Sequence, residues 1–189
     1  MTSVIKVDTI QNSTGGAVGI GDLGLTVDRG IVNVYQALNT SASTLTGVSG
    51  QYVDVQDLSI TLTPQSTSSK FLITARVFGE AAGTDGHDWS MALFDGSSHI
   101  NSGDAAGNRL RVICTAGSDH DAADSNSTPQ TWSATTLYAP ASTAERTIKV
   151  TMNNQGGTST LALNKTQGDS DSNSFERGSS ELIILEIVL

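Results

Sequence analysis

Tyr52 to Phe78 read Y-V-D-V-Q-D-L-S-I-T-L-T-P-Q-S-T-S-S-K-F-L-I-T-A-R-V-F, and this stretch decides the fold class. From Leu58 to Leu62 the apolar residues alternate with Ser and Thr, which is the period of a strand with one buried face. Because Pro64 cannot donate to a strand ladder, the first strand is expected to end before it. A second strand over Lys70 to Phe78 has an apolar face formed by Phe71, Ile73, Ala75 and Val77. We expect the two strands, joined by a polar turn, to be an antiparallel core unit.

Short segments of the same kind recur along the chain, about ten strands in all with no convincing helix. Besides the pair above, they include Ile31–Leu38, Trp89–Phe94, Ser97–Asn101, Arg109–Thr115, Thr131–Tyr138, Arg146–Met152, Thr160–Leu163 and Glu181–Leu189. The dipeptide Asp95-Gly96 predicts a hairpin turn. A second hairpin is expected to join Arg146–Met152 to Thr160–Leu163, whereas 39–50 is expected to be a small-polar loop. This pattern predicts an all-β chain, an antiparallel β-sandwich or a barrel.

The length of 189 residues suits one domain with a short appendage. Residues 1–30 are rich in glycine and have too little side-chain mass for a core of their own, so we expect a short glycine-rich β arm there. Residues 31–189 are expected to form the β-sandwich domain. The composition, rich in Gly, Ser, Thr, Asn and Asp, favours short strands with many turns over long helices.

Three features predict where the core lies. The final segment E-L-I-I-L-E-I-V-L, Glu181 to Leu189, is so apolar that it is expected to be central in a sheet or sealed between subunits. Trp89 and Trp132 fall on predicted strands, and we expect them in the core and not on a sugar-stacking platform. Cys114, the only cysteine, is expected to be a small buried side chain.

The formal charge of −9 comes from 19 acidic against 10 basic residues, and the chain has no basic run. This argues against a nucleic-acid partner held by phosphate contacts. The N-terminus has no apolar core long enough for a secretion signal, and no stretch approaches the length of a membrane span. We therefore expect neither export through a standard signal nor insertion into a membrane.

The opening S-V-I-K-V-D-T-I-Q-N-S-T-G-G-A-V, Ser3 to Val18, resembles the start of many tail-fibre and other virion proteins of tailed bacteriophages. In those proteins an I-K-V-D-x-I-Q-x-x-x-G block forms the attachment or shaft end. The resemblance implies that residues 1–30 attach this chain to other virion proteins. The alternative is a simple N-terminal strand followed by a glycine-rich turn.

A second block, W-S-M-A-L-F-D-G-S-S-H-I-N-S-G-D-A-A-G-N-R from Trp89 to Arg109, is similar to phage receptor-binding and fibre-tip domains. With the L-S-I-T-L-T-P block it extends the resemblance over most of 52–115. The resemblance implies an antiparallel sandwich of jelly-roll or tumour-necrosis-factor-like kind that assembles as a homotrimer. Beyond residue 115 no diagnostic motif is recognised.

Two acidic loops raise the question of a metal site. The segment 119–124 places Asp119, His120, Asp121 and Asp124 together, but the spacing matches no defined metal motif and favours a solvated loop. In 169–176, Asp169, Asp171 and Asn173 match the first ligand positions of a calcium loop. The match then fails, because Ser174 stands where glycine is needed and Ser180 where a bidentate Glu belongs. We expect no metal and no cofactor.

No catalytic constellation emerges. Cys114 has no His or Lys beside it in sequence, and the histidines His87, His99 and His120 lie in or near predicted loops without a nucleophile elbow. Asp85 and Asp88 are explained by polar turn chemistry as well as by a glycosidase pair. We therefore expect a protein that is not an enzyme.

The expected function is that of a phage virion structural protein, a trimeric tail fibre, head fibre or similar surface appendage. Loops at 80–88, 101–108, 116–129 and 165–180 would be presented to a host surface glycan or a neighbouring virion protein. Alternatives are a capsid decoration protein and, more remotely, a glycan-cleaving enzyme of a fibre.

Overall fold

The structure is a computed structural model that describes residues 30–47, 49–82, 89–115, 126–156 and 158–188. These residues contain no helix, and so none that is long and apolar enough to cross a membrane. The strands are β1 (Gly30–Asn39), β2 (Ser43–Gly47), β3 (Tyr52–Leu62), β4 (Lys70–Ala81), β5 (Trp89–Asp95), β6 (Ser98–His99), β7 (Cys114–Thr115), β8 (Gln130–Tyr138), β9 (Arg146–Asn154), β10 (Ser159–Leu163) and β11 (Ser180–Val188). The prediction of an all-β chain is confirmed.

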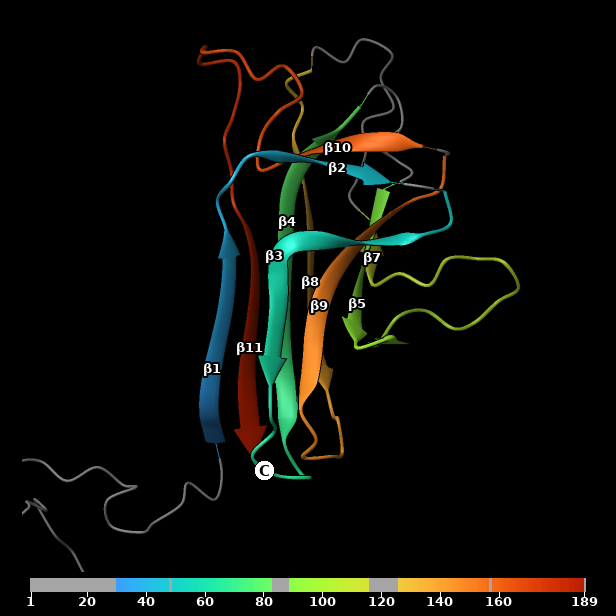
Figure 1. The fold of residues 1–189 in the computed structure, drawn as a ribbon, viewed down its shortest axis with the longest axis vertical. Helices are drawn as coiled ribbons and strands as arrows, with labels where there is room; N and C mark the ends of the chain where they lie inside the picture. Colours follow the sequence, from blue (N-terminus) through green and yellow to red (C-terminus); the bar gives the residue numbers. More distant parts are fainter. Residues whose placement is uncertain (1–29, 48, 83–88, 116–125, 157, 189) are drawn as a thin grey trace, which may run out of the picture.

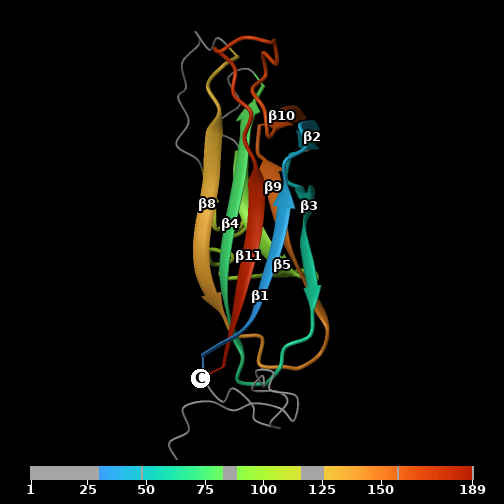
Figure 2. The ribbon, with the colours of Figure 1, turned by 90° about the vertical axis from the view of Figure 1, so that its left-hand side faces the viewer.

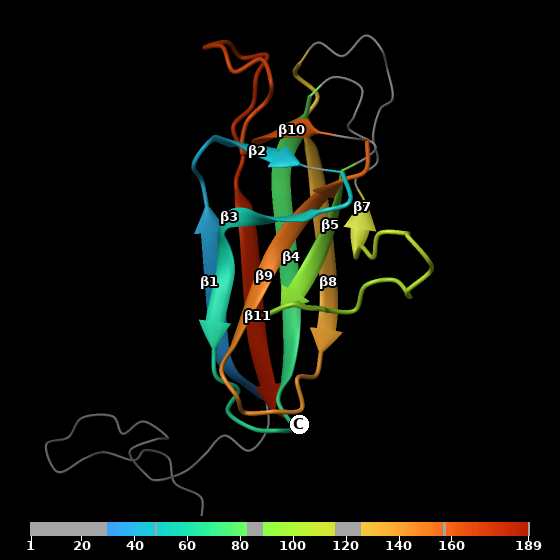
Figure 3. The same ribbon diagram turned by 45° about the vertical axis from the view of Figure 1, so that its right-hand side comes forward.

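The strands form two antiparallel sheets that pack as a sandwich (Figures 1 and 3). One sheet has six strands in the order β1-β11-β4-β10-β2, with β8 on the other edge of β4. The other has five strands in the order β3-β9-β5-β6, with β7 also paired to β5. The predicted sandwich is therefore confirmed. As expected, the apolar β11 is central, because it pairs with β1 on one side and β4 on the other.

The core lies between the inner faces of the two sheets. The alternating residues predicted for β4 and β3 are all buried, with Phe71, Ile73 and Leu58 fully inaccessible. Trp89 and Trp132 are also fully buried, as expected, and the indole Nε1 of Trp132 donates a hydrogen bond of 3.0 Å to the Trp89 carbonyl oxygen. This bond crosses the sandwich, from β8 of one sheet to β5 of the other.

The expected pairing of the two organising strands is wrong. β3 pairs with β9, whereas β4 pairs with β8, β10 and β11, so the turn over 63–69 carries the chain from one sheet to the other. Both strands still bury their apolar faces in the same core. An alternating sequence predicts which face of a strand is buried, but it does not predict which strands pair with it.

The second expected hairpin is wrong as well. β9 pairs with β3 and β5, while β10 pairs with β4 and with β2, a strand inside the segment predicted to be a loop. The β2 sequence S-T-L-T-G is short and polar, so its strand character depends on its partner and not on local propensity. Gly47 at its end lies so close to the Trp89 ring that an added Cβ would sit 2.6 Å from it.

Two further strands are shorter than predicted. Only Ser98–His99 of the segment 97–101, and only Cys114–Thr115 of 109–115, are strands. The connection 100–113 between them is irregular and is tied to β5 by the Ile100 and Ile113 amides, which donate to the Leu93 and Met91 carbonyls. The predicted turn is confirmed, with Gly96 at a φ of 59° between β5 and β6.

The two ends of the sandwich differ in what they carry. β1 begins and β11 ends at one end, which we call the terminal end; the short connections 63–69 and 139–145 lie there too (Figure 1). At the opposite end, which we call the loop end, β4 ends and β8 and β11 begin. The long connection 164–179 emerges there (Figure 1).

Candidate binding surfaces

The loop end is held together by a buried carboxylate. Glu80 near the end of β4 is only 2% exposed. Its Oε1 accepts hydrogen bonds from the backbone amide and the hydroxyl of Thr128, at 2.9 and 3.1 Å, and its Oε2 accepts one from the Gln167 amide at 2.7 Å. Because charge-assisted bonds of this kind are strong, Glu80 fixes two distant connections, 126–129 and 164–179, to one strand.

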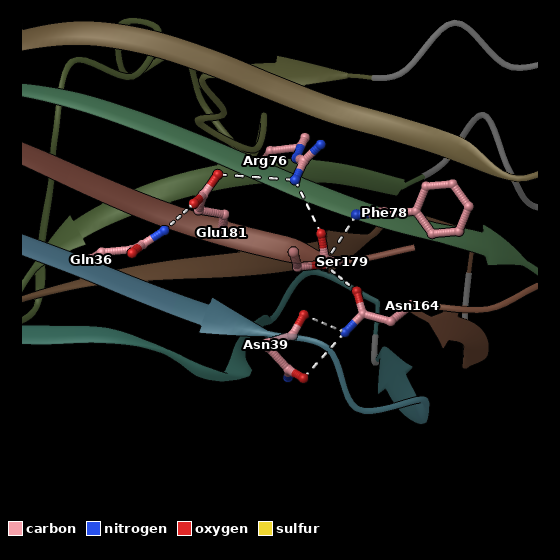
Figure 4. A network of polar contacts seen from close by, with 8 residues as sticks. Gln36, Asn39, Arg76, Phe78, Asn164, Ser179 and Glu181 are labelled. Atoms are coloured by element: carbon pink, nitrogen blue, oxygen red, sulfur yellow. Dashed lines mark hydrogen bonds and ion pairs between the residues drawn. The ribbon is translucent and has the colours of Figure 1, made fainter. Parts of the chain in front are cut away.

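A second polar centre anchors the start of β11 (Figure 4). Asn164, at a φ of 59°, donates from its Nδ2 to the Asn39 carbonyl oxygen at 3.0 Å. Its Oδ1 accepts from the Ser180 hydroxyl at 2.7 Å, and the Ser180 Oγ in turn accepts from the Phe78 amide. β1, β4, β10 and β11 are thereby joined at the loop end, which gives the connection 164–179 a rigid base.

The acidic residues that partly match a calcium loop, in 169–176, do not come together as ligands. Asp169 forms ion pairs with Arg177 at 2.5 Å and with Lys165 at 3.4 Å. Asp171 and Asn173 are exposed, and Ser180 belongs to β11. Across the described ranges, no group of three or more His, Cys, Asp or Glu side chains is placed to hold a metal ion.

Several predicted site residues lie outside the described residues. These are the acidic loop residues Asp119, His120, Asp121 and Asp124, together with Asp85, His87 and Asp88. Residues 1–29, which carry the attachment motif, are outside as well.

Two of the residues considered as catalytic groups, Cys114 and His99, are among the described residues. Cys114 is half-buried on β7, not fully buried as expected, and desolvation raises the pKa of its thiol. His99 lies on β6, inside the predicted strand Ser97–Asn101, and burial together with the nearby Arg111 lowers its pKa. A raised thiol pKa disfavours the thiolate, so Cys114 lacks the main property of a catalytic nucleophile.

The outer face of the six-stranded sheet carries a row of apolar side chains. The strand registers place Val34 of β1 opposite Leu185 of β11, Leu185 opposite Leu72 of β4, and Leu72 opposite Leu137 of β8. These four strands lie side by side in Figure 2. Val34 is 67% exposed and Leu137 51% exposed. We call this set of four residues the apolar row.

Further apolar side chains flank the apolar row. Ile31 and Leu38 of β1 are also more than half exposed, and with Val34 and Leu137 they are the large apolar side chains that the described part of the chain leaves exposed. Ile31 pairs with Ile187, two residue pairs closer to the terminal end than Val34 and Leu185. Toward the loop end the row is bordered by the exposed Thr74–Thr135 pair and the Arg76–Glu181 ion pair. Neighbouring exposed apolar side chains such as Val34 and Leu137 are typical of a protein interaction site.

The outer face of the five-stranded sheet carries an aromatic cluster instead. The rings of Tyr52 on β3 and Phe94 on β5 meet edge-to-face with centroids 5.1 Å apart, and His99 lies 5.0 Å from Tyr52 and 4.3 Å from Phe94. The Tyr52 hydroxyl donates to the Arg111 carbonyl at 3.0 Å and accepts from the Arg111 amide at 2.9 Å. The cluster is therefore fixed to the connection 100–113.

Beside this cluster lies a hollow of about 400 Å³, which we call the β3–β9 hollow. Tyr52, Phe94 and Thr151 contribute to its lining, and at its rim the Lys149 Nζ lies 2.8 Å from the Asp54 Oδ1. The Nζ is also 5.9 Å from the centre of the Phe94 ring, a cation–π distance. The hollow thus combines an apolar wall with a paired anion and cation.

Sequence reasoning did not identify the residues of the β3–β9 hollow. They come from three strands, and they meet only because Phe94 pairs with Lys149, and Asp54 with Thr151, in the sheet registers. The spacing of residues along the chain does not show which strands are neighbours. Each of these residues only alternates outward along its own strand. The resemblance did not find them either, although it covers Tyr52 and Phe94.

The chain was compared with known proteins. No protein-family model matches it, and no curated protein is significantly similar to it.

Proposed function

We propose that this protein is a structural component of a tailed-phage virion: a homotrimeric surface appendage that attaches through residues 1–30 and binds its target at the loop end. The observation that carries the proposal is the polarity of the sandwich. The attachment motif precedes β1, which begins at the terminal end, while the long connection 164–179 emerges at the opposite end (Figure 1).

The distance between these ends suits an appendage. β11 runs from the loop end to the terminal end over nine residues, which is about 30 Å at ~3.3 Å per residue. A chain anchored at one end therefore holds the connections of the loop end well away from the anchor. Glu80 and Asn164 keep the bases of those connections rigid, which lowers the entropy lost on binding.

The apolar row supports the assembly part of the proposal. Four neighbouring strands present Val34, Leu185, Leu72 and Leu137 without a charged residue among them. Covering this surface with further copies removes it from water, and each copy then presents its own loop end. Several presented sites raise a weak contact to useful avidity on a repetitive host surface, for which a glycan is the class implied by the resemblance.

The test combines solution mass with location on particles. Light scattering of the full-length protein is expected to give about 59 kDa, three times the chain mass of 19.6 kDa. Deleting residues 2–29 is expected to leave a folded sandwich that no longer copurifies with virions. A stable monomer contradicts the trimeric appendage and favours a decoration protein, and copurification of the shortened chain contradicts the attachment role.

A further inference from the structure

We infer that the β3–β9 hollow is a binding site for one neutral sugar unit. The inference goes beyond the proposed function, because the hollow lies on the outer face of the five-stranded sheet and not at the loop end. In an assembly held through the apolar row, the hollow remains open, since the two surfaces belong to opposite faces of the sandwich (Figure 3).

The apolar wall of the site is rigid before any ligand arrives. The Tyr52 ring is braced by the edge-to-face contact with Phe94 and by both hydrogen bonds to the Arg111 backbone. Sugar rings have apolar C–H patches that pack on aromatic groups, and a wall that needs no ordering loses little entropy on binding.

The rim supplies a matched donor and acceptor for hydroxyl groups. Lys149 offers ammonium hydrogens and Asp54 offers carboxylate oxygens, with Nζ 2.8 Å from Oδ1 and 2.9 Å from Oδ2. Two neighbouring hydroxyls of one sugar, one donating to Asp54 and the other accepting from Lys149, satisfy both groups with charge-assisted bonds.

The charge balance selects a neutral ligand. Asp54 and Lys149 cancel, and burial together with Arg111 lowers the pKa of His99, which keeps that ring neutral near pH 7. An anionic ligand would meet the Asp54 carboxylate, and Lys149, the cation in the lining, is already paired with that carboxylate.

The size fits a single ring rather than a long chain. The hollow of about 400 Å³ lies at the small end of ligand sites, which run from about 300 to 1,000 Å³. A larger hollow of about 910 Å³, lined in part by Ser49, Arg109 and Gln155, contains no aromatic wall. We therefore assign the sugar to the smaller site.

The test uses the full-length protein and a set of defined sugars. Glucose, galactose, mannose and N-acetylglucosamine are titrated to high millimolar concentration against ¹⁵N-labelled protein, with N-acetylneuraminic acid as the anionic probe. At least one neutral sugar is expected to shift the amides of Tyr52, Gly96 and Thr151, with saturation in the millimolar range.

The variant Asp54→Asn is expected to weaken this binding by at least about tenfold, because it removes a charged acceptor without changing shape. Asp57→Asn is the matched control, since Asp57 is also an exposed aspartate of β3 but does not line the hollow; it is expected to leave binding unchanged. Absence of shifts in the hollow, shifts with N-acetylneuraminic acid alone, or equal binding by Asp54→Asn would each overturn the inference. Location on virions is measured separately, so a failure here is distinct from a failure of the proposed function.

Discussion

The two outer faces of the sandwich differ in chemistry, although their inner faces share one apolar core. On the six-stranded sheet the apolar row crosses β1, β11, β4 and β8. On the five-stranded sheet the outward residues include Asp54, Lys149 and Thr151, beside the ring of Tyr52. Burying an exposed apolar surface against another protein is favourable, whereas a polar surface with an aromatic wall suits a small polar ligand.

The difference originates in particular strands. In β11, Leu182 and Ile184 are buried in the core, and the residues between them, such as Ile183 and Leu185, are apolar too. In β3 the residues between buried positions are Ser59 and Thr61. The same alternating geometry thus gives β11 apolar side chains on both of its faces, whereas β3 carries serine and threonine on its outer face.

The largest expected effect comes from placing charge in the apolar row. The double variant Val34→Lys and Leu137→Lys adds two lysines at exposed positions, so the sandwich is expected to fold while the assembly dissociates. Light scattering should then show a mass near 20 kDa, that of a single chain. The matched control, Gln56→Lys and Thr61→Lys, changes two exposed positions of β3 and is expected to keep the trimer mass. Equal masses for the two variants would remove the proposed contrast between the faces.

A smaller effect is expected from Glu186, a buried carboxylate beneath the apolar row. It accepts hydrogen bonds from the Asn33 side chain at 2.7 Å, the Gln65 amide at 2.6 Å and the Ser69 hydroxyl at 2.7 Å. The change Glu186→Gln converts one acceptor oxygen to a donor, and the expected loss in the free energy of unfolding is about 3 kcal/mol. Urea unfolding measures it; a loss below about 1 kcal/mol would show that these bonds are not stabilising.

Glu186 also predicts a pH dependence. Burial alone raises the pKa of this carboxyl, but hydrogen bonds from Ser69, Asn33, Gln65 and Tyr35 together outweigh burial and hold the pKa below its usual value. The ionised form is therefore stabilised by folding, so its contribution is present above the unfolded-state pKa and is lost as the pH falls through the folded-state pKa. Unfolding curves between pH 7 and pH 3 should show this loss in the native protein and a shallower one in Glu186→Gln.

A still smaller effect on stability is expected from Tyr52→Phe, on the outer face of the five-stranded sheet. The change removes both hydrogen bonds to the Arg111 backbone, at a cost of about 1–2 kcal/mol in the free energy of unfolding. The assembly mass is expected to stay the same, because Tyr52 lies on the face without the apolar row. Thermal unfolding and light scattering on one sample measure both; dissociation by this variant would show that the two faces are not independent.

The smallest effect on stability is expected from Asp54→Asn. The Asp54 carboxylate is 60% exposed, and ion pairs at such exposure contribute about 0–1 kcal/mol, so unfolding should change by less than that. The change matters for binding and not for folding. A large loss of stability would show that the ion pair is structural, which would weaken its role in the hollow.

The buried faces were predictable from the sequence because they follow from period alone. The alternation in Leu58 to Leu62 and in Phe71 to Val77, the two tryptophans and the apolar final strand all occupy the predicted core. The pairing of the strands was not predictable in the same way. The pairings of β3 with β9 and of β10 with β2 and β4 join residues that lie far apart along the chain, and no local signal specifies them.

The sequence by itself determined that the chain is all-β, which residues of the two organising strands face the core, and that the first of them ends before Pro64. These properties depend on local geometry: side chains alternate along a strand, and proline cannot donate. The tertiary structure alone decided which strands are neighbours, and therefore that Val34, Leu185, Leu72 and Leu137 form one row and that Tyr52, Asp54 and Lys149 share one hollow. The physical reason is that a sheet register is a long-range arrangement, chosen by how all the strands together bury their apolar faces.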